Sequence, residues 1–146
     1  MGGVLLNREN KIFLGHRNDS IQSWQMPQGG IDEGEQPVEA FLREMKEEVG
    51  TNQFDLLAST QKWYQYDFPA EIREKLQNLY KNNIQGQKQL WFLCRMNENT
   101  IINIETDHRE FSAYKWATPS EVIDNCVAFK RDVYINVLKE FNLLAV

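Results

Sequence analysis

Three glutamates, Glu44, Glu47 and Glu48, lie three and four residues apart in a segment whose apolar residues have helical spacing. Residues at this spacing project from one face of an α-helix, so the three carboxylates would cluster there. Like charges at this separation destabilise an isolated helix by about a few tenths of a kcal/mol per pair. Oxygen ligands at this density suit magnesium or manganese, which also bridge to substrate phosphates. The alternative is a solvated acidic face without a ligand.

The element expected to hold these carboxylates is a helix over residues 37–49. Pro37 suits a first helical turn, and Gly50 suits a left-handed helix end. The apolar residues that recur at helical spacing are Val38, Phe41, Leu42, Met45 and Val49. The helix would therefore bury one face against a sheet and leave the acidic face free.

The rest of the chain alternates irregularly between predicted strands and helices. Short apolar runs at 3–7 and 11–16, separated by Arg8-Glu9-Asn10, predict a hairpin. Segments 54–68 (one or two strands), 90–96 and 112–117 predict strands. Segments 70–80, 119–124 after an N-capping Thr118, and 129–144 predict helices, and 81–87 predicts a polar loop. This order favours a mixed sheet covered by helices.

Length and composition indicate one globular domain over residues 1–146. No apolar run approaches the roughly 20 residues of a membrane span, and the N-terminus does not resemble a signal peptide. We therefore expect a cytoplasmic protein with no membrane partner. Cys94 and Cys126 lack metal-ligand spacing and are expected to be reduced thiols in the core.

The charge balance limits the kinds of partner. Lysine and arginine number 16 against 21 acidic residues, a formal net charge of −5. Proteins that coat long nucleic acids normally carry the opposite balance, because their affinity comes from neutralising phosphates. No groove for a long nucleic acid is expected, and a phosphate-rich ligand would need a local basic patch or a divalent cation.

The segment from Gly29 to Thr51 resembles the Nudix box, G-x5-E-x7-R-E-U-x-E-E-x-G-U, in which U is a bulky aliphatic residue. The fixed positions are filled by Gly29, Glu35, Arg43, Glu44, Glu47, Glu48 and Gly50. Met45 fills the first U position, and Thr51 departs from the second. The chain is therefore identified as similar to Nudix hydrolases. That resemblance implies an α/β fold, an α/β/α sandwich around a mixed β-sheet.

The resemblance also implies roles for the box residues. Glu44, Glu47 and Glu48 would ligate Mg²⁺, with Mn²⁺ as the alternative. Glu44 or Glu48 would accept the proton of the attacking water, and the sequence does not distinguish between these two candidates. Arg43 would pair with a box glutamate and orient it for catalysis. Gly29 and Gly30 would turn the chain sharply before the helix.

Segments outside the box resemble the bacterial Nudix branch of RNA pyrophosphohydrolases and dinucleoside polyphosphate (diadenosine tetraphosphate) hydrolases. They are residues 24–30, 86–89, 110–111 with Trp116, and 129–134. Relatives in this branch carry additional N-terminal residues with an Arg-Pro step before the glycine that matches Gly3. Contacts made by that arginine are therefore not carried over.

Four kinds of contact follow from this second resemblance. Glu110 matches a carboxylate that supplements the metal site, against the alternative of an exposed loop acid. Arg17 and Lys130 match cations near the phosphates, although each alone resembles a solvated charge. Phe129 matches an aromatic that stacks on the terminal base, but an aromatic before a helix is more often a core residue, so both roles stay open. Gln87 would line the cleft or begin a strand. Three tryptophans are expected in the core: Trp24, Trp63 and Trp91.

The function expected from the resemblance is removal of pyrophosphate from the 5′-triphosphate end of RNA. The alternative is hydrolysis of dinucleoside polyphosphates. A different class, a non-catalytic nucleotide-binding Nudix module, is disfavoured because the glutamate set is intact. The oligomeric state stays open.

Overall fold

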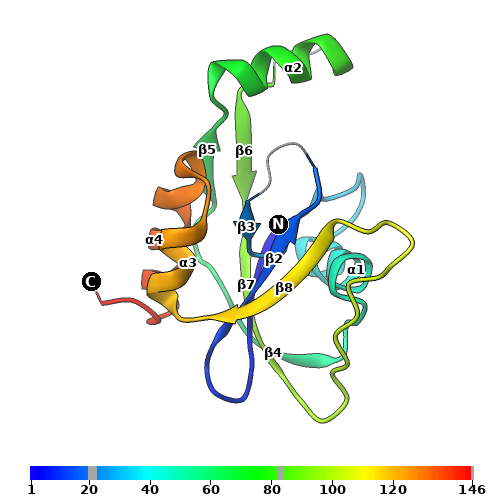
Figure 1. Ribbon diagram of the computed structural model, residues 1–146, viewed down its shortest axis with the longest axis vertical. Helices are drawn as coiled ribbons and strands as arrows, with labels where there is room; N and C mark the ends of the chain where they lie inside the picture. The colour runs from blue at the N-terminus through cyan, green and yellow to red at the C-terminus, as the bar shows by residue number, and fades with distance from the viewer. Residues whose placement is uncertain (20–22, 82–83, 146) are drawn as a thin grey trace.

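A mixed β-sheet forms the centre of the fold, with strand order β3-β2-β1-β7-β4 and β8 also paired to β2 (Figure 1). The computed structural model describes residues 1–19, 23–81 and 84–145. The strands of this sheet are β1 (Gly2–Leu6), β2 (Ile12–Arg17), β3 (Trp24–Gln25), β4 (Phe54–Ser59), β7 (Trp91–Met96) and β8 (Phe111–Ala117). Strand β1 runs parallel to β7, and the other pairs are antiparallel.

Helices cover both faces of this sheet, as Figure 1 shows. Helix α1 (Pro37–Val49) packs on one face through Phe41, Met45 and Val49, which are fully buried with Phe13 and Phe92 of the sheet. The other face is covered by α3 (Pro119–Asn125), the 3₁₀ turn η1 (Ala128–Lys130) and α4 (Arg131–Glu140). The predicted α/β/α sandwich around a mixed sheet is confirmed.

A separate two-stranded sheet extends away from the main one. Its strands are β5 (Tyr64–Asp67) and β6 (Gly86–Gln89), paired antiparallel from Tyr64↔Gln89 to Asp67↔Gly86. Helix α2 (Ala70–Tyr80) follows β5 and lies across the far end of this hairpin (Figure 1). The inner side of the hairpin faces α4 and η1, so residues from the middle and the end of the chain meet there.

Most element predictions agree with the structure. The helix over 37–49 has the predicted bounds, with proline in its first turn and Gly50 in the left-handed region at φ 83°. Thr118 caps α3 in a reciprocal capping box with Glu121. Cys94 and Cys126 are buried free thiols. In the described part of the chain, no helix is long and apolar enough to cross a membrane.

Three expectations need correction. The segment predicted as a polar loop over 81–87 ends in strand, because Gly86 and Gln87 pair with β5; residues 82 and 83 lie outside the described residues. The helix predicted over 129–144 spans only Arg131–Glu140, because a 3₁₀ turn precedes it and the chain turns after Phe141. Trp63 is 44% exposed on the hairpin rather than in the core, whereas Trp91 is fully buried and Trp24 half-buried.

Candidate active site

Helix α1 presents its three glutamates at graded depth. The buried apolar face fixes the rotation of the helix, so that the acidic face turns toward the loop before it. Glu47 has 38% of its side chain exposed, Glu44 has 15%, and Glu48 as a residue is 2% exposed. The solvated acidic face considered from the sequence therefore describes Glu47 best, whereas Glu48 is inside the protein.

Glu48 is buried with one carboxylate oxygen unsatisfied. The backbone of Gln28 donates a hydrogen bond to this carboxylate, but Oε2 has no partner among the described residues. Burial, followed by the charges of Glu44 and Glu110, raises the pKa of Glu48 well above its ordinary value. An unpaired buried carboxylate oxygen is costly. A cation bound beside it would remove that cost.

Arg43 joins the loop before α1 to the acidic face of the helix. Its Nε and Nη2 donate to Glu35 at 2.9 and 3.0 Å, its Nη1 donates to Glu44 at 2.9 Å, and its Nη2 also donates to the Gly30 carbonyl at 2.9 Å. These bonds to Arg43 lower the pKa of Glu35 to about 2. Nη1 of Arg43 also donates to Glu47 at 3.5 Å, so one guanidinium contacts three box glutamates. Glu35, which the sequence left without a role, is its bidentate partner.

The glycines of this loop differ from the expectation. The glycines in the left-handed region are Gly34 and Gly50, so conformational freedom is required there rather than at Gly29 and Gly30. Gly29 is required for space instead, because a Cβ at this position would lie 2.0 Å from Cδ of Glu44. Any larger residue would push the carboxylate out of its position. No such contact lies within 4 Å at Gly30.

Glu110 approaches the same carboxylates from the segment before β8. It is exposed, and its charge is close enough to raise the pKa of both Glu44 and Glu48, after the larger effect of burial. Across residues 1–19, 23–81 and 84–145, no three or more acidic, histidine or cysteine side chains converge as a ready metal site. The available donors are nevertheless hard oxygens, and the unpaired Oε2 of Glu48 points to a cation. The donor set fits a divalent metal.

Two cations predicted to lie near phosphates meet beside this cluster. Nζ of Lys130 donates to Oε1 of Gln25 at 3.0 Å and of Gln28 at 3.2 Å, and Nη1 of Arg17 donates to the same Gln25 oxygen at 3.4 Å. Lys130 is 1% exposed, so it is not a solvated charge. Burial and the neighbouring Arg17 lower the pKa of Lys130 to about 7. Arg17 also pairs with Asp19.

Phe129 lies at the junction of the core and a cavity. Its ring centroid is 5.6 Å from Tyr66 and 6.0 Å from Phe68, and the ring is half-buried against the core cluster. Tyr66 donates its hydroxyl hydrogen to Gln87 at 2.8 Å. These residues enclose a cavity of about 170 Å³, lined by Arg17, Gln28, Tyr66, Phe68, Ile72, Leu76, Gln87, Phe129 and Lys130. Tyr66 was not singled out from the sequence, since only the distant packing of β5 on η1 brings it here.

Gln87 separates this cavity from a second one. Strand β6 lines a neighbouring cavity of about 220 Å³ together with Gly29, Gly30 and Ile31. A larger hollow of about 550 Å³ lies between α4 and the start of β5 and includes none of the predicted site residues. Gln28 contacts both Glu48 and Lys130, so the carboxylates adjoin the region that holds the two cations and the aromatic rings. Such a region can hold a chain of phosphates between a base and a metal.

Comparison with known proteins shows the family to which the chain belongs. The NUDIX domain family model matches residues 1–137, and the chain belongs to this family of hydrolases, as the box predicted. The chain is 45% identical over 146 residues to the RNA pyrophosphohydrolase of Rickettsia prowazekii, covering 99% of this chain and 89% of the relative. Hydrolases of this family generally need a divalent metal.

Solved structures share the fold at low identity. The dihydroneopterin triphosphate pyrophosphohydrolase of E. coli superposes with a TM-score of 0.74 at 21% identity, covering 94% of this chain and 93% of that one. A C. elegans Ap4A hydrolase superposes with a TM-score of 0.66 at 17% identity, covering 98% of both chains.

Proposed function

We propose that this protein removes pyrophosphate from the 5′-triphosphate end of RNA. The observation that carries the proposal is the position of Gln28. Its backbone contacts the buried Glu48, and its side-chain oxygen accepts a hydrogen bond from Lys130. The carboxylate cluster and the cationic, aromatic cavity therefore adjoin, as binding of a short polyphosphate with one base requires.

Glu44, Glu47, Glu48 and Glu110 would hold Mg²⁺, or Mn²⁺ in its place. When bound, the metal neutralises phosphate oxygens and lowers the pKa of a coordinated water. Arg17 and Lys130 bind the phosphates, and Phe129 with Tyr66 holds the terminal base. Glu44 or Glu48 takes the proton as the water oxygen bonds to phosphorus. The α–β phosphoanhydride bond breaks, so pyrophosphate leaves and the RNA keeps a 5′-monophosphate.

The relatives named RNA pyrophosphohydrolase support this substrate, as does the net charge of −5, which disfavours binding along a long RNA. A second substrate class is a dinucleoside polyphosphate. The second cavity, on the other side of Gln87 beside Gly29, offers room for part of another nucleoside. An Ap4A hydrolase also shares the fold.

The test is parallel turnover of 5′-triphosphorylated RNA and diadenosine tetraphosphate with magnesium, with all products resolved. We expect 5′-monophosphorylated RNA and pyrophosphate, with kcat/KM at least about tenfold higher on RNA. A preference for diadenosine tetraphosphate would favour the second candidate. Binding of both without turnover at any metal concentration would indicate a non-catalytic module.

A further inference from the structure

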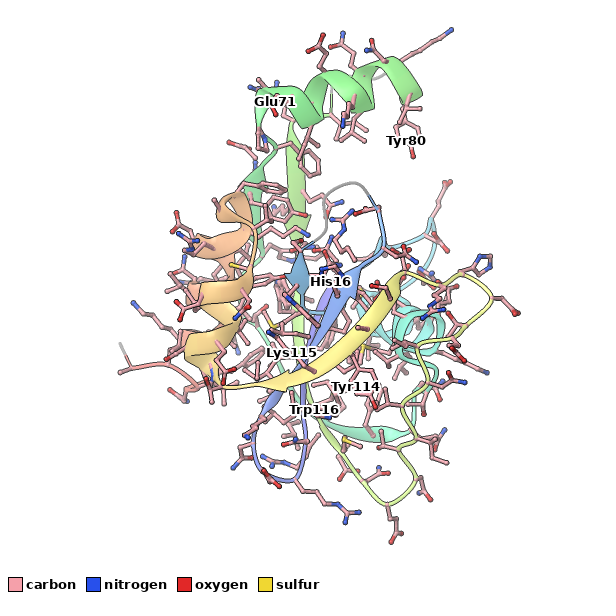
Figure 2. The ribbon with its side chains drawn as sticks, in the orientation of Figure 1. His16, Glu71, Tyr80, Tyr114, Lys115 and Trp116 are labelled. Carbon is pink, nitrogen blue, oxygen red and sulfur yellow. The ribbon has the colours of Figure 1, made fainter. Side chains whose placement is uncertain are left out.

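Helix α2 projects from the fold with very little packing of its own. Figure 2 labels Glu71 and Tyr80 near its two ends, beyond the tip of the β5–β6 hairpin. None of its 11 residues is buried, and Leu79 and Tyr80 are 73% and 62% exposed. An isolated helix of this length is marginal in water, because packing supplies most helical stability in proteins. Burial in the core therefore does not explain the position of α2.

The two half-buried residues of α2 are Ile72 and Leu76. They lie four positions apart, and so on one face of the helix. Both line the cavity of about 170 Å³ that contains Phe129, Arg17 and Lys130. The one shielded face of α2 is thus directed at the candidate substrate cavity rather than at the core.

The chemistry of this cavity suits one nucleobase with its phosphates. Tyr66 and Phe129 supply aromatic rings, Ile72 and Leu76 supply aliphatic surface, and Lys130 lies 5.8 Å from the centre of the Tyr66 ring. Pockets for drug-sized ligands measure about 300–1,000 Å³. The smaller volume here fits part of a nucleotide, with the apolar surfaces covering a base.

We propose that Ile72 and Leu76 complete the base-binding site and set its affinity for the terminal nucleobase of the substrate. This inference rests on the proposed function, since it takes a nucleoside polyphosphate as the ligand. The base covers both aliphatic side chains, and α2 gains apolar contacts that it lacks in the free protein. The helix is a specificity element of the site, and it leaves the reacting phosphates to the residues of the main sheet and α1.

The experiment compares a ligand that has a base with one that does not. Dissociation constants for a 5′-triphosphorylated dinucleotide and for inorganic triphosphate are measured calorimetrically with magnesium, in a Glu48→Gln background that slows turnover. The double variant Ile72→Ala/Leu76→Ala should raise the dissociation constant of the dinucleotide about tenfold. It should change the dissociation constant of inorganic triphosphate by less than about twofold. Alanine maintains the helix, since it has the highest helix propensity.

Two control variants accompany the double substitution. Leu79→Ala removes an exposed leucine from the same helix, and Ile72→Leu/Leu76→Met keeps the apolar volume. Both should bind the dinucleotide within about twofold of the parent. The single variant Leu76→Ala should weaken binding of the dinucleotide by about threefold. It tests the same apolar surface with a smaller change.

The proposal is overturned if the alanine variants bind the dinucleotide as tightly as the parent, or if both ligands weaken equally. The proposed function fails by a different result, namely absence of 5′-monophosphorylated RNA from wild-type reactions. A base-dependent loss of affinity would support the role of Ile72 and Leu76 in either case, because affinity is measured by calorimetry and not from the rate of product formation.

Discussion

Lys130 donates a hydrogen bond from Nζ to Oε1 of Gln28 at 3.2 Å, although the two residues lie 102 positions apart in the sequence. Gln28 also supplies the backbone hydrogen bond to Glu48. One glutamine thus sets the spacing between the cation and the deepest carboxylate of the site. Because Gln28 holds the buried ammonium group in place, it would restrict where phosphates bind in the proposed site.

Replacement of Lys130 by methionine should change the pH dependence of stability. The pKa of Lys130 in the folded protein is about 7, below its ordinary value of 10.5, so the unfolded chain binds more protons between these values. The contribution of Lys130 to the free energy of unfolding therefore falls as pH drops from 10.5 to 7 and levels off below. The free energy of unfolding is measured with urea in the presence of a chelator. As pH falls from 9.5 to 7, Lys130→Met should become more stable relative to the wild type by on the order of 2 kcal/mol.

The matched control is Lys75→Met on the exposed side of α2, which should follow the wild type at both pH values. Lys130→Met should also raise KM on triphosphorylated RNA by about tenfold or more, because a phosphate contact is lost. A pH-independent difference between Lys130→Met and the wild type would show that Lys130 does not carry this titration.

Glu48→Gln should separate catalysis from folding. The amide keeps the size of the side chain but removes the buried carboxylate, whose pKa is raised by burial. The melting temperature in chelator should therefore stay equal or rise, because no charge has to be buried. kcat should fall by about two to four orders of magnitude, and the rise in melting temperature on adding magnesium should shrink. Glu39→Gln, exposed on the first turn of the same helix, should leave all three measurements unchanged. A fall in kcat of less than about tenfold would show that Glu48 is neither a metal ligand nor the general base.

Phe129 should affect binding more than stability. Its ring contacts Tyr66 and Phe68 and is only half-buried, so Phe129→Ala should cost less than the roughly 3–5 kcal/mol of a fully buried phenylalanine. KM should rise by the equivalent of about 1–3 kcal/mol, the worth of one base stack. Phe129→Leu, which keeps apolar volume without a ring, should restore most of the stability and little of the affinity. A large fall in melting temperature with unchanged KM would make Phe129 a core residue only.

Arg43→Lys should lower activity and stability together, since a lysine cannot contact Glu35, Glu44 and the Gly30 carbonyl at once. The pKa of Glu35 is lowered to about 2 by Arg43, so the wild type has this stabilisation above pH 4.5 and loses it as pH falls through 2. The difference in melting temperature between the two proteins should therefore shrink over that interval. Glu35→Gln should show the same pH dependence of its difference in melting temperature from the wild type. A difference that stays constant with pH would argue against a stabilising Arg43–Glu35 ion pair.

The sequence by itself determined the local features of this protein. Helical spacing and proline and glycine preferences fix α1 and its end at Gly50 from neighbouring residues alone. The same periodicity places Glu44, Glu47 and Glu48 on one face. Because the Nudix box is contiguous, family and fold could be predicted before any distance was known.

Only the tertiary structure decided how deep each group lies and which distant residues meet. Glu48 is buried while Glu47 keeps 38% of its side chain exposed, because Glu48 faces the backbone of Gln28 in the folded chain. Tyr66 and Lys130 reach one cavity because β5 packs on η1, a contact between segments with no shared pattern. Lys130 resembles a surface lysine in the sequence, and its burial follows from side chains that only the folded chain brings around it.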